Sequence, residues 1–190
     1  WAPTSRRSST CSSKPAPSLP PLTFPDFLHI AQQAVGFTSW LYLDVLAESW
    51  ATGQSQVILK ARQVGVSYLL ATYACYRMIY GATVMMFSRG QRESTELMDK
   101  ARTVYRHLPS PYDVPLTTSN DSEMALSSGG RILAFPSTED TGRGYTCDLI
   151  IADEAAFHPY AARNYQAYRP ASLDRGGQML MVSTANGPLG

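Results

Sequence analysis

The sequence predicts an α/β protein with a mainly parallel sheet flanked by helices, and three observations support this prediction. Apolar runs with the length and composition of strands buried on both faces occur at residues 57–59, 84–87, 149–152 and 179–182. Segments with helical periodicity separate several of these runs. A glycine-containing turn joins the first run to a helix, as in a phosphate-binding loop. In open sheets of this kind, ligands bind beyond the carboxyl ends of the strands.

The composition fits one folded domain with little net charge. The chain has 190 residues, and 44% of them are hydrophobic, so a sizeable core can form. The 16 basic and 15 acidic side chains nearly cancel, so net charge does not indicate a nucleic-acid partner. Cys11, Cys75 and Cys147 are far apart and odd in number, which predicts neither a zinc site nor a disulfide framework. We expect a reducing compartment, and no apolar run is long enough to cross a membrane.

The first 25 residues differ from the rest of the chain. They are rich in Ser and Pro, carry basic but no acidic side chains, and lack the apolar stretch of a secretory signal. We expect residues 1–25 to be a disordered tail and residues 26–190 to form one domain. Because the chain starts with Trp1 and stops directly after an informative motif, we also expect it to be part of a longer protein.

Residues 26–50 predict two helices, the first of them capped by Asp26. The aromatic side chains of the second are expected to pack in the core, and the alternative is a shelf that contacts an adenine. The elements predicted after these helices are a strand at 57–60, a helix at 66–80, a strand at 82–88, a helix from Arg89 to His107, a hairpin at 124–137 that turns at Gly129 and Gly130, a strand at 147–157, a helix at 160–170, and a last strand with its exit loop at 177–187.

The turn after the first strand departs from the usual phosphate-loop pattern, in which a lysine precedes the Ser or Thr. Here Lys60 stands at the position of the first glycine, and Val66 stands at the position of the lysine. Gly65 and Ser67 match the turn glycine and the hydroxyl that binds Mg²⁺. A basic turn before a core helix explains the same residues equally well. The loop alone therefore does not distinguish a phosphate-binding loop from an ordinary turn.

Two carboxylates follow the apolar run at 149–152. In a phosphate site, Asp153 would hold the hydration shell of Mg²⁺, and Glu154 would orient or deprotonate the attacking water. The alternative is an acidic loop of the kind found after many strands. A phosphate-type loop upstream favours the catalytic interpretation.

Two further segments are weaker signals when taken alone. Ser183, Thr184 and Asn186 directly follow the last strand and would contact a γ-phosphate or its water, with an ordinary turn as the alternative. Arg143 lies between glycines just before the carboxylate strand, and a guanidinium suits the charge of a transferring phosphoryl group. The alternative for Arg143 is a solvated loop arginine.

The predicted helix after the second strand carries basic side chains that could meet DNA or a neighbouring subunit. A solvated helix face is the favoured interpretation. The residues are Arg89, Arg92, Lys100, Arg102 and Arg106.

Taken in order, several segments resemble the ATPase domain of the large terminase subunits of tailed bacteriophages: KARQVGVS, FSRGQRES, GGRILAFPS, TGRGYT, LIIADEAAF and VSTANG. Such subunits are ATP-driven motors that move double-stranded DNA into a prohead during virion assembly. The resemblance covers residues 26–190 and implies a P-loop NTPase fold of the ASCE/RecA-like type. It also implies ATP and Mg²⁺ as cofactors. The implied partners are double-stranded DNA, the portal protein, the small terminase subunit and further copies of the chain in a ring on the prohead. No membrane is involved, and the expected location is the host cytoplasm, with a virus or a prophage as the source of the gene.

The resemblance assigns a nucleotide-binding role to a deviant Walker A loop formed by Lys60, Ala61, Arg62, Gln63, Val64, Gly65, Val66 and Ser67. Some terminases carry the lysine at the front of this loop, so Lys60 would reach the β- and γ-phosphates and Ser67 would bind Mg²⁺. Arg62 belongs to an RQ pair whose arginine acts in catalysis or in sensing the nucleotide. Whether Lys60 or Arg62 supplies the main phosphate charge stays open.

The other segments receive roles by the same resemblance. Asp153 matches the Walker B aspartate that holds Mg²⁺, and Glu154 matches the catalytic glutamate. Arg143 matches the catalytic arginine of the RG segment, and whether it acts in its own subunit or reaches a neighbouring one stays open. A coupling motif, which links hydrolysis to movement, is formed by Ser183, Thr184 and Asn186.

Two other functions remain open. A helicase or translocase of another P-loop family shares the same motifs, and a catalytically inactive fragment would also fit the deviant loop. Large terminases continue into a nuclease domain with a carboxylate metal cluster, which this sequence lacks, so we expect no nuclease activity here. We expect weak ATPase activity from the chain alone, because ring assembly and further segments complete the site in this family.

Overall fold

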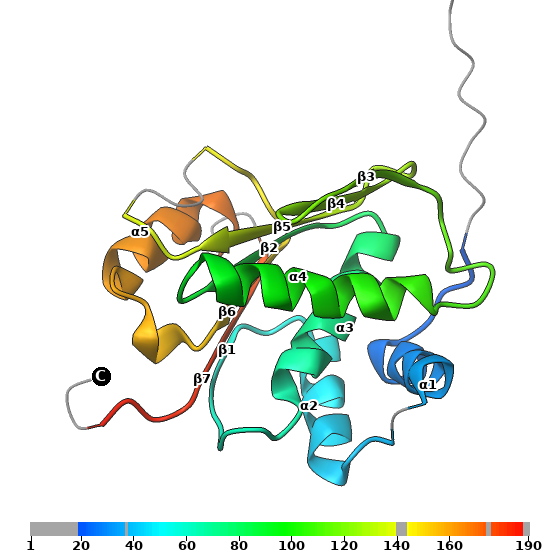
Figure 1. The fold of residues 1–190 in the computed structure, drawn as a ribbon, viewed down its shortest axis with the longest axis horizontal. Helices are drawn as coiled ribbons and strands as arrows, with labels where there is room; N and C mark the ends of the chain where they lie inside the picture. Colours follow the sequence, from blue (N-terminus) through cyan, green and yellow to red (C-terminus); the bar gives the residue numbers. More distant parts are fainter. Residues whose placement is uncertain (1–18, 37, 140–143, 174–175, 188–190) are drawn as a thin grey trace, which may run out of the picture.

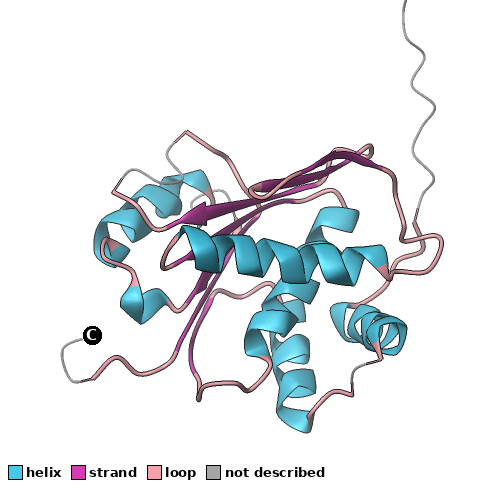
Figure 2. Ribbon diagram, in the orientation of Figure 1, coloured by secondary structure: helices cyan, strands magenta, loops and turns pink. Residues whose placement is uncertain are grey.

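A seven-stranded sheet runs through the molecule, with α1 to α4 on one side and α5 on the other (Figures 1 and 2). The structure is a computed structural model that describes residues 19–36, 38–139, 144–173 and 176–187. The helices are α1 (Phe24–Val35), α2 (Leu41–Ala51), α3 (Val66–Ile79), α4 (Gln91–Arg106) and α5 (Ala161–Ala171), with a short 3₁₀ turn η1 (Ala155–Phe157). The strands are β1 (Gln56–Leu59), β2 (Thr83–Ser88), β3 (Leu116–Ser119), β4 (Glu123–Leu126), β5 (Arg131–Pro136), β6 (Leu149–Asp153) and β7 (Gln178–Ser183).

The strand order is β1-β7-β6-β2-β5-β4-β3, and the first five strands in this order are parallel. β4 pairs antiparallel with β5, in the hairpin predicted around Gly129 and Gly130, and antiparallel with β3, so among the described strands β4 alone runs against the others. The prediction of a mainly parallel sheet flanked by helices is therefore confirmed. In this order β1, β7 and β6 are neighbours, so the segments that follow them leave the same edge of the sheet.

The sheet has a separate apolar core on each face. The larger core packs α1 to α4 against the sheet and contains the fully buried side chains of Phe24, Trp50 and Tyr73. The smaller core lies beneath α5, where the ring of Tyr168 stacks on Phe87 with centroids 4.3 Å apart. Helices on both faces make β6 fully buried, as the sequence predicted for residues 149–152.

The prediction that residues 57–59 are buried on both faces is wrong. Strand β1 pairs only with β7 among the described residues, so it forms an edge of the sheet. As a result, the side chains of Val57 and Leu59 are 83% and 76% exposed. The expected packing of the aromatic side chains of α2 holds for Trp50, which is buried, but not for Trp40 and Tyr42, which are largely exposed.

The start of the domain also differs from expectation. Thr23, and not Asp26, caps α1: its hydroxyl oxygen accepts a hydrogen bond from the backbone N–H of Asp26 at 3.3 Å. Leu19 and Leu22 pack against the larger core, so the domain begins before residue 26. The rest of the predicted tail, residues 1–18, lies outside the described residues.

Three of the five basic side chains named for this helix pair with carboxylates of α4. Arg89 pairs with Glu93 at 2.7 Å, Arg92 pairs with Glu96 at 2.9 Å, and Arg102 pairs with Asp99. This pairing favours the solvated face over a polyanion-binding surface.

The part of the chain that the structure describes includes no helix long and apolar enough to cross a membrane.

The hairpin turn offers a test of the packing between the sheet and α3. A Cβ atom at Gly130 would overlap the carbonyl oxygen of Met78 at the end of α3, whereas a Cβ at Gly129 would meet nothing within 4 Å. We expect Gly130→Ala to destabilise the protein by about 3 kcal/mol, because the overlap forces backbone movement. Gly129→Ala, at φ +99°, is the control and should cost only about 1 kcal/mol. Urea unfolding measures both, and equal losses would contradict the close approach of the hairpin to α3.

Candidate active site

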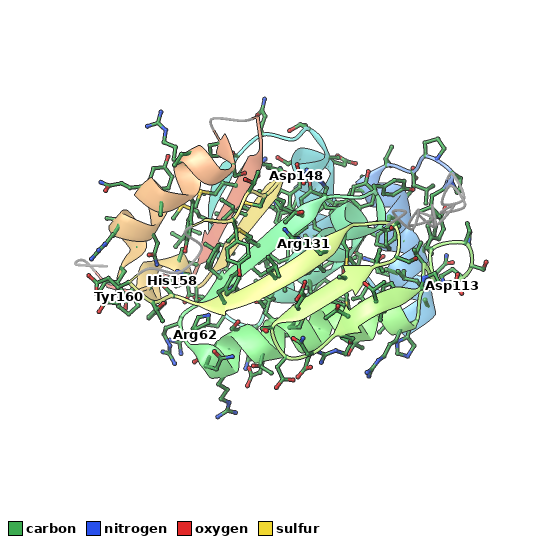
Figure 3. The ribbon with its side chains drawn as sticks, turned by 90° about the horizontal axis from the view of Figure 1, so that it is seen from above. Arg62, Asp113, Arg131, Asp148, His158 and Tyr160 are labelled. Carbon is green, nitrogen blue, oxygen red and sulfur yellow. The ribbon has the colours of Figure 1, made fainter. Side chains whose placement is uncertain are left out.

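A cavity of about 410 Å³ opens at the edge of the sheet where β1, β6 and β7 end. Its size is in the range of small-molecule sites. It is lined by the loop between β1 and α3, by the end of β6, by the residue after β7 and by the first half of α4. The predicted site residues that line it are Lys60, Arg62, Gln63, Ser67, Asp153, Glu154 and Thr184. Figure 3 places Arg62 and His158 toward the end of the sheet at which the parallel strands point, whereas Arg131 and Asp148 lie toward the other end.

The loop between β1 and α3 owes its shape to two residues with left-handed backbone. Gln63 has φ 58°, which is uncommon for a residue other than glycine, and Gly65 has φ 76°. The hydroxyl of Tyr42, on α2, donates a hydrogen bond to the carbonyl oxygen of Val64 at 2.6 Å and so holds the crest of the loop. Backbone strain of this kind concentrates at functional sites, where the surroundings must stabilise it.

The start of α3 is suited to an anion. Gly65 is its N-cap residue, and among the described residues no side chain caps the helix and no acid lies in its first turn. The N–H groups and the positive dipole end of α3 therefore face the loop without a carboxylate of the first turn to balance them. This is the arrangement that the sequence predicted for a phosphate-binding loop.

Asp153, at the end of β6, is 8% exposed and borders the cavity together with Ser67. Burial raises the pKa of Asp153 above its ordinary value of 3.8, although the nearby Ser67 hydroxyl and the charge of Lys60 oppose the shift. A buried carboxylate beside a hydroxyl is an all-oxygen donor pair of the kind that Mg²⁺ prefers.

These two residues fit a magnesium ion held partly by other ligands. Within the described part of the chain, no group of three or more His, Cys, Asp or Glu side chains could hold a metal by itself. Mg²⁺ commonly binds through one or two protein oxygens and completes its shell with water and phosphate. Ser67 and Asp153 would supply the protein oxygens.

Glu154 makes hydrogen bonds through both carboxylate oxygens. Its Oε1 lies 2.6 Å from Nζ of Lys60, and its Oε2 accepts hydrogen bonds from the backbone N–H and the hydroxyl of Thr184 at 3.0 and 2.9 Å. Burial acts to raise the pKa of Glu154, but the hydrogen bonds from Lys60 and Thr184 outweigh it, so the pKa lies below its ordinary value. Glu154 is therefore ionised at neutral pH, as a general base must be.

The backbone at Glu154 is also left-handed, with φ 53° and ψ 45°, and η1 follows it directly. The last residue of β7 and the segment after this strand hold the turn in place. The hydroxyl of Ser183 accepts a hydrogen bond from the N–H of Ala156 at 3.1 Å, and the side-chain amide of Asn186 donates to the carbonyl oxygen of Ala156 at 2.9 Å. Ser183, Thr184 and Asn186 thus contact either Glu154 or the turn after it.

His158 was not predicted from the sequence. It is buried, and its Nε2 lies 2.9 Å from the carbonyl oxygen of Asp153, to which the tautomer protonated at Nε2 donates. Burial lowers the pKa of His158, so the ring is neutral at pH 7. A lone histidine five residues after a strand carries no pattern that would have identified this contact.

The segment after β2 was also not predicted to line the site. Arg89, before α4, and Glu93 and Lys100, on α4, border the cavity, and the available signal was that β2 ends at the same edge of the sheet as β6.

Other predicted residues lie away from the cavity or outside the described chain. Ala61, Val64 and Val66 line a separate apolar groove beside α2, which also includes Tyr42. Arg143 lies outside the described residues, so its predicted catalytic role stays a prediction.

A parallel sheet with a glycine turn, a helix N-terminus and two carboxylates at its carboxyl edge defines the class of P-loop nucleotide-binding domains. The family model for the large terminase subunit, T4-like virus type, N-terminal, matches residues 57–189. The chain belongs to this family of terminase large subunits.

Solved structures with the same fold are also terminases. The ATPase domain of the large terminase of Thermus phage P74-26 has a TM-score of 0.60 at 18% identity, over 82% of this chain and 68% of that one. An arginine-to-alanine mutant of the same domain has a TM-score of 0.64 at 18% identity, over 83% and 69%. The large terminase of bacteriophage HK97 has a TM-score of 0.66 at 14% identity, and 38% of its length is covered by 85% of this chain. No curated protein sequence gives a significant match.

The buried carboxylate of Asp153 predicts a stability penalty that depends on pH. A carboxyl group whose pKa is raised by folding disfavours the folded state once it ionises, so the free protein should lose stability as pH rises through and above 3.8. We expect Asp153→Asn to be more stable than the wild type at pH 7 in the presence of EDTA. Thermal unfolding at pH 7 and at about pH 3 measures the effect, and the gain should vanish at the lower pH. A variant that is less stable than the wild type at pH 7 would show that burial of the Asp153 charge carries no net penalty.

Proposed function

We propose that this chain is the ATP-hydrolysing motor domain of a large terminase subunit, which drives double-stranded viral DNA into a prohead. One observation carries the proposal. Lys60 and Ser67 from the loop, Asp153 and Glu154 from β6 and its end, and Thr184 after β7 border one cavity at the carboxyl edge of the sheet. Membership of the terminase family supports the choice of this motor over a helicase of another P-loop family.

The triphosphate would lie against the loop and the start of α3. The N–H groups of the first turn of α3 would bind its oxygens, and Lys60 and Arg62 would supply positive charge. Mg²⁺, held by Ser67 and Asp153, would neutralise charge on the β- and γ-phosphates when bound. Gln63, whose backbone is left-handed, also borders the cavity at this loop.

Glu154 would orient the attacking water and accept its proton. Its low pKa keeps the carboxylate ionised, and the two hydrogen bonds from Thr184 fix its orientation. Positioning of this kind is the main contribution of a protein to phosphoryl transfer, because the transition state needs little covalent assistance. Arg143 would stabilise the transferring phosphoryl group, either in its own subunit or in a neighbour.

Ser183, Thr184 and Asn186 would couple hydrolysis to movement. Thr184 bonds the carboxylate of Glu154, while Ser183 and Asn186 bond the turn that follows it. A change in the position of Glu154 would therefore displace both η1 and the segment that follows β7.

We propose residues 26–190, together with residues 19–25 that precede them, as part of a longer ATPase domain. The exposed apolar side chains of Val57 and Leu59 on β1 support further polypeptide at this edge. The proposed partners are the portal protein, the small terminase subunit and other copies of the chain in a ring. The proposed location is the host cytoplasm, and we propose that any nuclease activity belongs to a different domain.

Glu154→Gln tests the catalytic assignment. The substitution keeps the shape of the side chain but removes the base, so we expect ATP turnover to fall about 10²- to 10⁴-fold while nucleotide binding is retained. The measurement is phosphate release together with titration of a fluorescent ATP analogue. Asp99→Asn removes an exposed carboxylate of α4 outside the cavity and is the control. Undiminished turnover in Glu154→Gln would reject the role of Glu154.

The same titration tests the broader proposal. The wild-type chain should bind the fluorescent analogue in the presence of Mg²⁺, and excess ATP should displace it. Absence of binding at millimolar nucleotide would favour a catalytically inactive domain instead.

A packaging assay with proheads and the full-length protein tests the motor function. DNA should become resistant to external nuclease in the presence of wild-type protein and ATP, and Glu154→Gln should abolish this protection. Protection of DNA by the Glu154→Gln protein would show that the translocating ATPase lies elsewhere.

A further inference from the structure

Lys60 has a partner that its predicted role does not explain. Its side chain borders the cavity, and its ammonium group lies 2.6 Å from Oε1 of Glu154. The side chain of Lys60 is only 9% exposed, whereas that of Glu154 is 34% exposed. The lysine expected to hold the phosphates is therefore paired with the carboxylate expected to activate water.

The pair leaves Glu154 with little capacity to act as a base. Thr184 already donates two hydrogen bonds to Oε2, and Lys60 occupies Oε1. A base must present a carboxylate oxygen to the attacking water at hydrogen-bond distance. Oε1 keeps a second lone pair, but the positive charge of Lys60 at 2.6 Å opposes proton uptake by the carboxylate until the ammonium group moves away.

A bound triphosphate provides a reason for that movement. The backbone of Lys60 is anchored at the front of the loop, where its N–H donates to the carbonyl oxygen of Ser183 at 2.9 Å, so only the side chain has to change direction. A triphosphate carries several negative charges against the single charge of Glu154, and the attraction grows with charge. Arg62 and Arg89, which also border the cavity, would remain to balance the carboxylates there.

We propose that Lys60 exchanges partners: in the free protein it holds Glu154 in place and occupied, and an arriving triphosphate draws it away so that Glu154 can accept a proton from water. The exchange rests on the proposed function and adds a positioning role for Lys60 to it. It makes the base available only when there is a phosphate to attack. The exchange also gives both Lys60 and Arg62 a role in phosphate binding. Lys60 takes up this role only after it has left the carboxylate of Glu154.

The exchange has a thermodynamic consequence that can be measured without hydrolysis. Breaking the ion pair costs free energy during binding, so the pair weakens the affinity for nucleotide. Removing the negative charge of Glu154 should therefore tighten binding, but only when Lys60 is present to benefit. A general relief of charge repulsion would instead tighten binding whether Lys60 is present or not.

A double-mutant cycle separates these two cases. The affinity for the Mg²⁺ complex of a non-hydrolysable ATP analogue is measured by calorimetry for the wild type, Glu154→Gln, Lys60→Met and the double variant. We expect Glu154→Gln to bind about three- to tenfold more tightly than the wild type, as befits a partly exposed ion pair. In the Lys60→Met background, Glu154→Gln should change the affinity by less than about twofold, because the pair is already broken.

Glu93→Gln is the matched control, because Glu93 borders the same cavity but pairs with Arg89. Its effect on affinity should be the same in the presence and absence of Lys60. The melting temperatures of the four cycle proteins without nucleotide provide a second readout, and they should be non-additive because the pair exists in the free protein.

The outcomes distinguish the exchange from the proposed function. Binding in all four proteins with an equal gain from Glu154→Gln in both backgrounds, or with no gain at all, would overturn the exchange alone. Absence of binding in the wild type would reject the proposed function, and the exchange with it, even if the melting temperatures show the ion pair.

Discussion

The parallel pairing of β1, β7 and β6 is the constraint on which the site depends. Leu59 lies opposite Ser183, and Val182 lies opposite Asp153, so the segments that follow these strands leave the sheet at one level. The hydrogen bond from Lys60 to Ser183 continues the ladder past the end of β1. A shift by one residue in either pairing would turn the side chains of the shifted strand to the other face and separate the lysine from its carboxylate. The two apolar cores fix the register of β6 and β7, which bury alternate side chains on both faces, whereas β1 is held by its pairing with β7.

Backbone strain at the site lies in the turns that follow these strand ends. Gln63 and Glu154 both adopt left-handed backbone, and each borders the cavity. Hydrogen bonds from distant segments hold them: Tyr42 bonds the loop, and Ser183 and Asn186 bond the turn after Glu154. The site is therefore a set of short turns, each strained, that are stabilised by one another and by a rigid sheet. This interdependence explains how Ser183 and Asn186 can respond to the position of a carboxylate at the end of β6 without lining the cavity themselves.

Much of the fold was predictable because burial imposes patterns on the sequence. Runs such as residues 149–152 and the periodic face of α4 indicated the helices, the hairpin and every strand except β3 to within a few residues, and the order of the strand ends predicted that the loop and the two carboxylates would meet. Other features depend on contacts that no pattern encodes. The edge position of β1 depends on which strands are its neighbours. An apolar run has the same sequence pattern in the middle of a sheet as at its edge. Thr23 caps α1 in place of Asp26 because Pro25 already lies inside the first turn. The bond from His158 to Asp153 and the partner of Lys60 depend on side-chain directions in the folded protein.

If the loop and the end of β6 act as one site, they must bind a single metal–triphosphate complex between them. A crystal structure with Mn²⁺ and a non-hydrolysable ATP analogue can decide this, because the anomalous signal distinguishes the metal from water and other light atoms. We expect a single peak at about 2.1 to 2.2 Å from the Ser67 hydroxyl or from a water bound to Asp153, with the triphosphate against the start of α3. A peak elsewhere, or a nucleotide bound away from Ser67 and Asp153, would contradict a shared site.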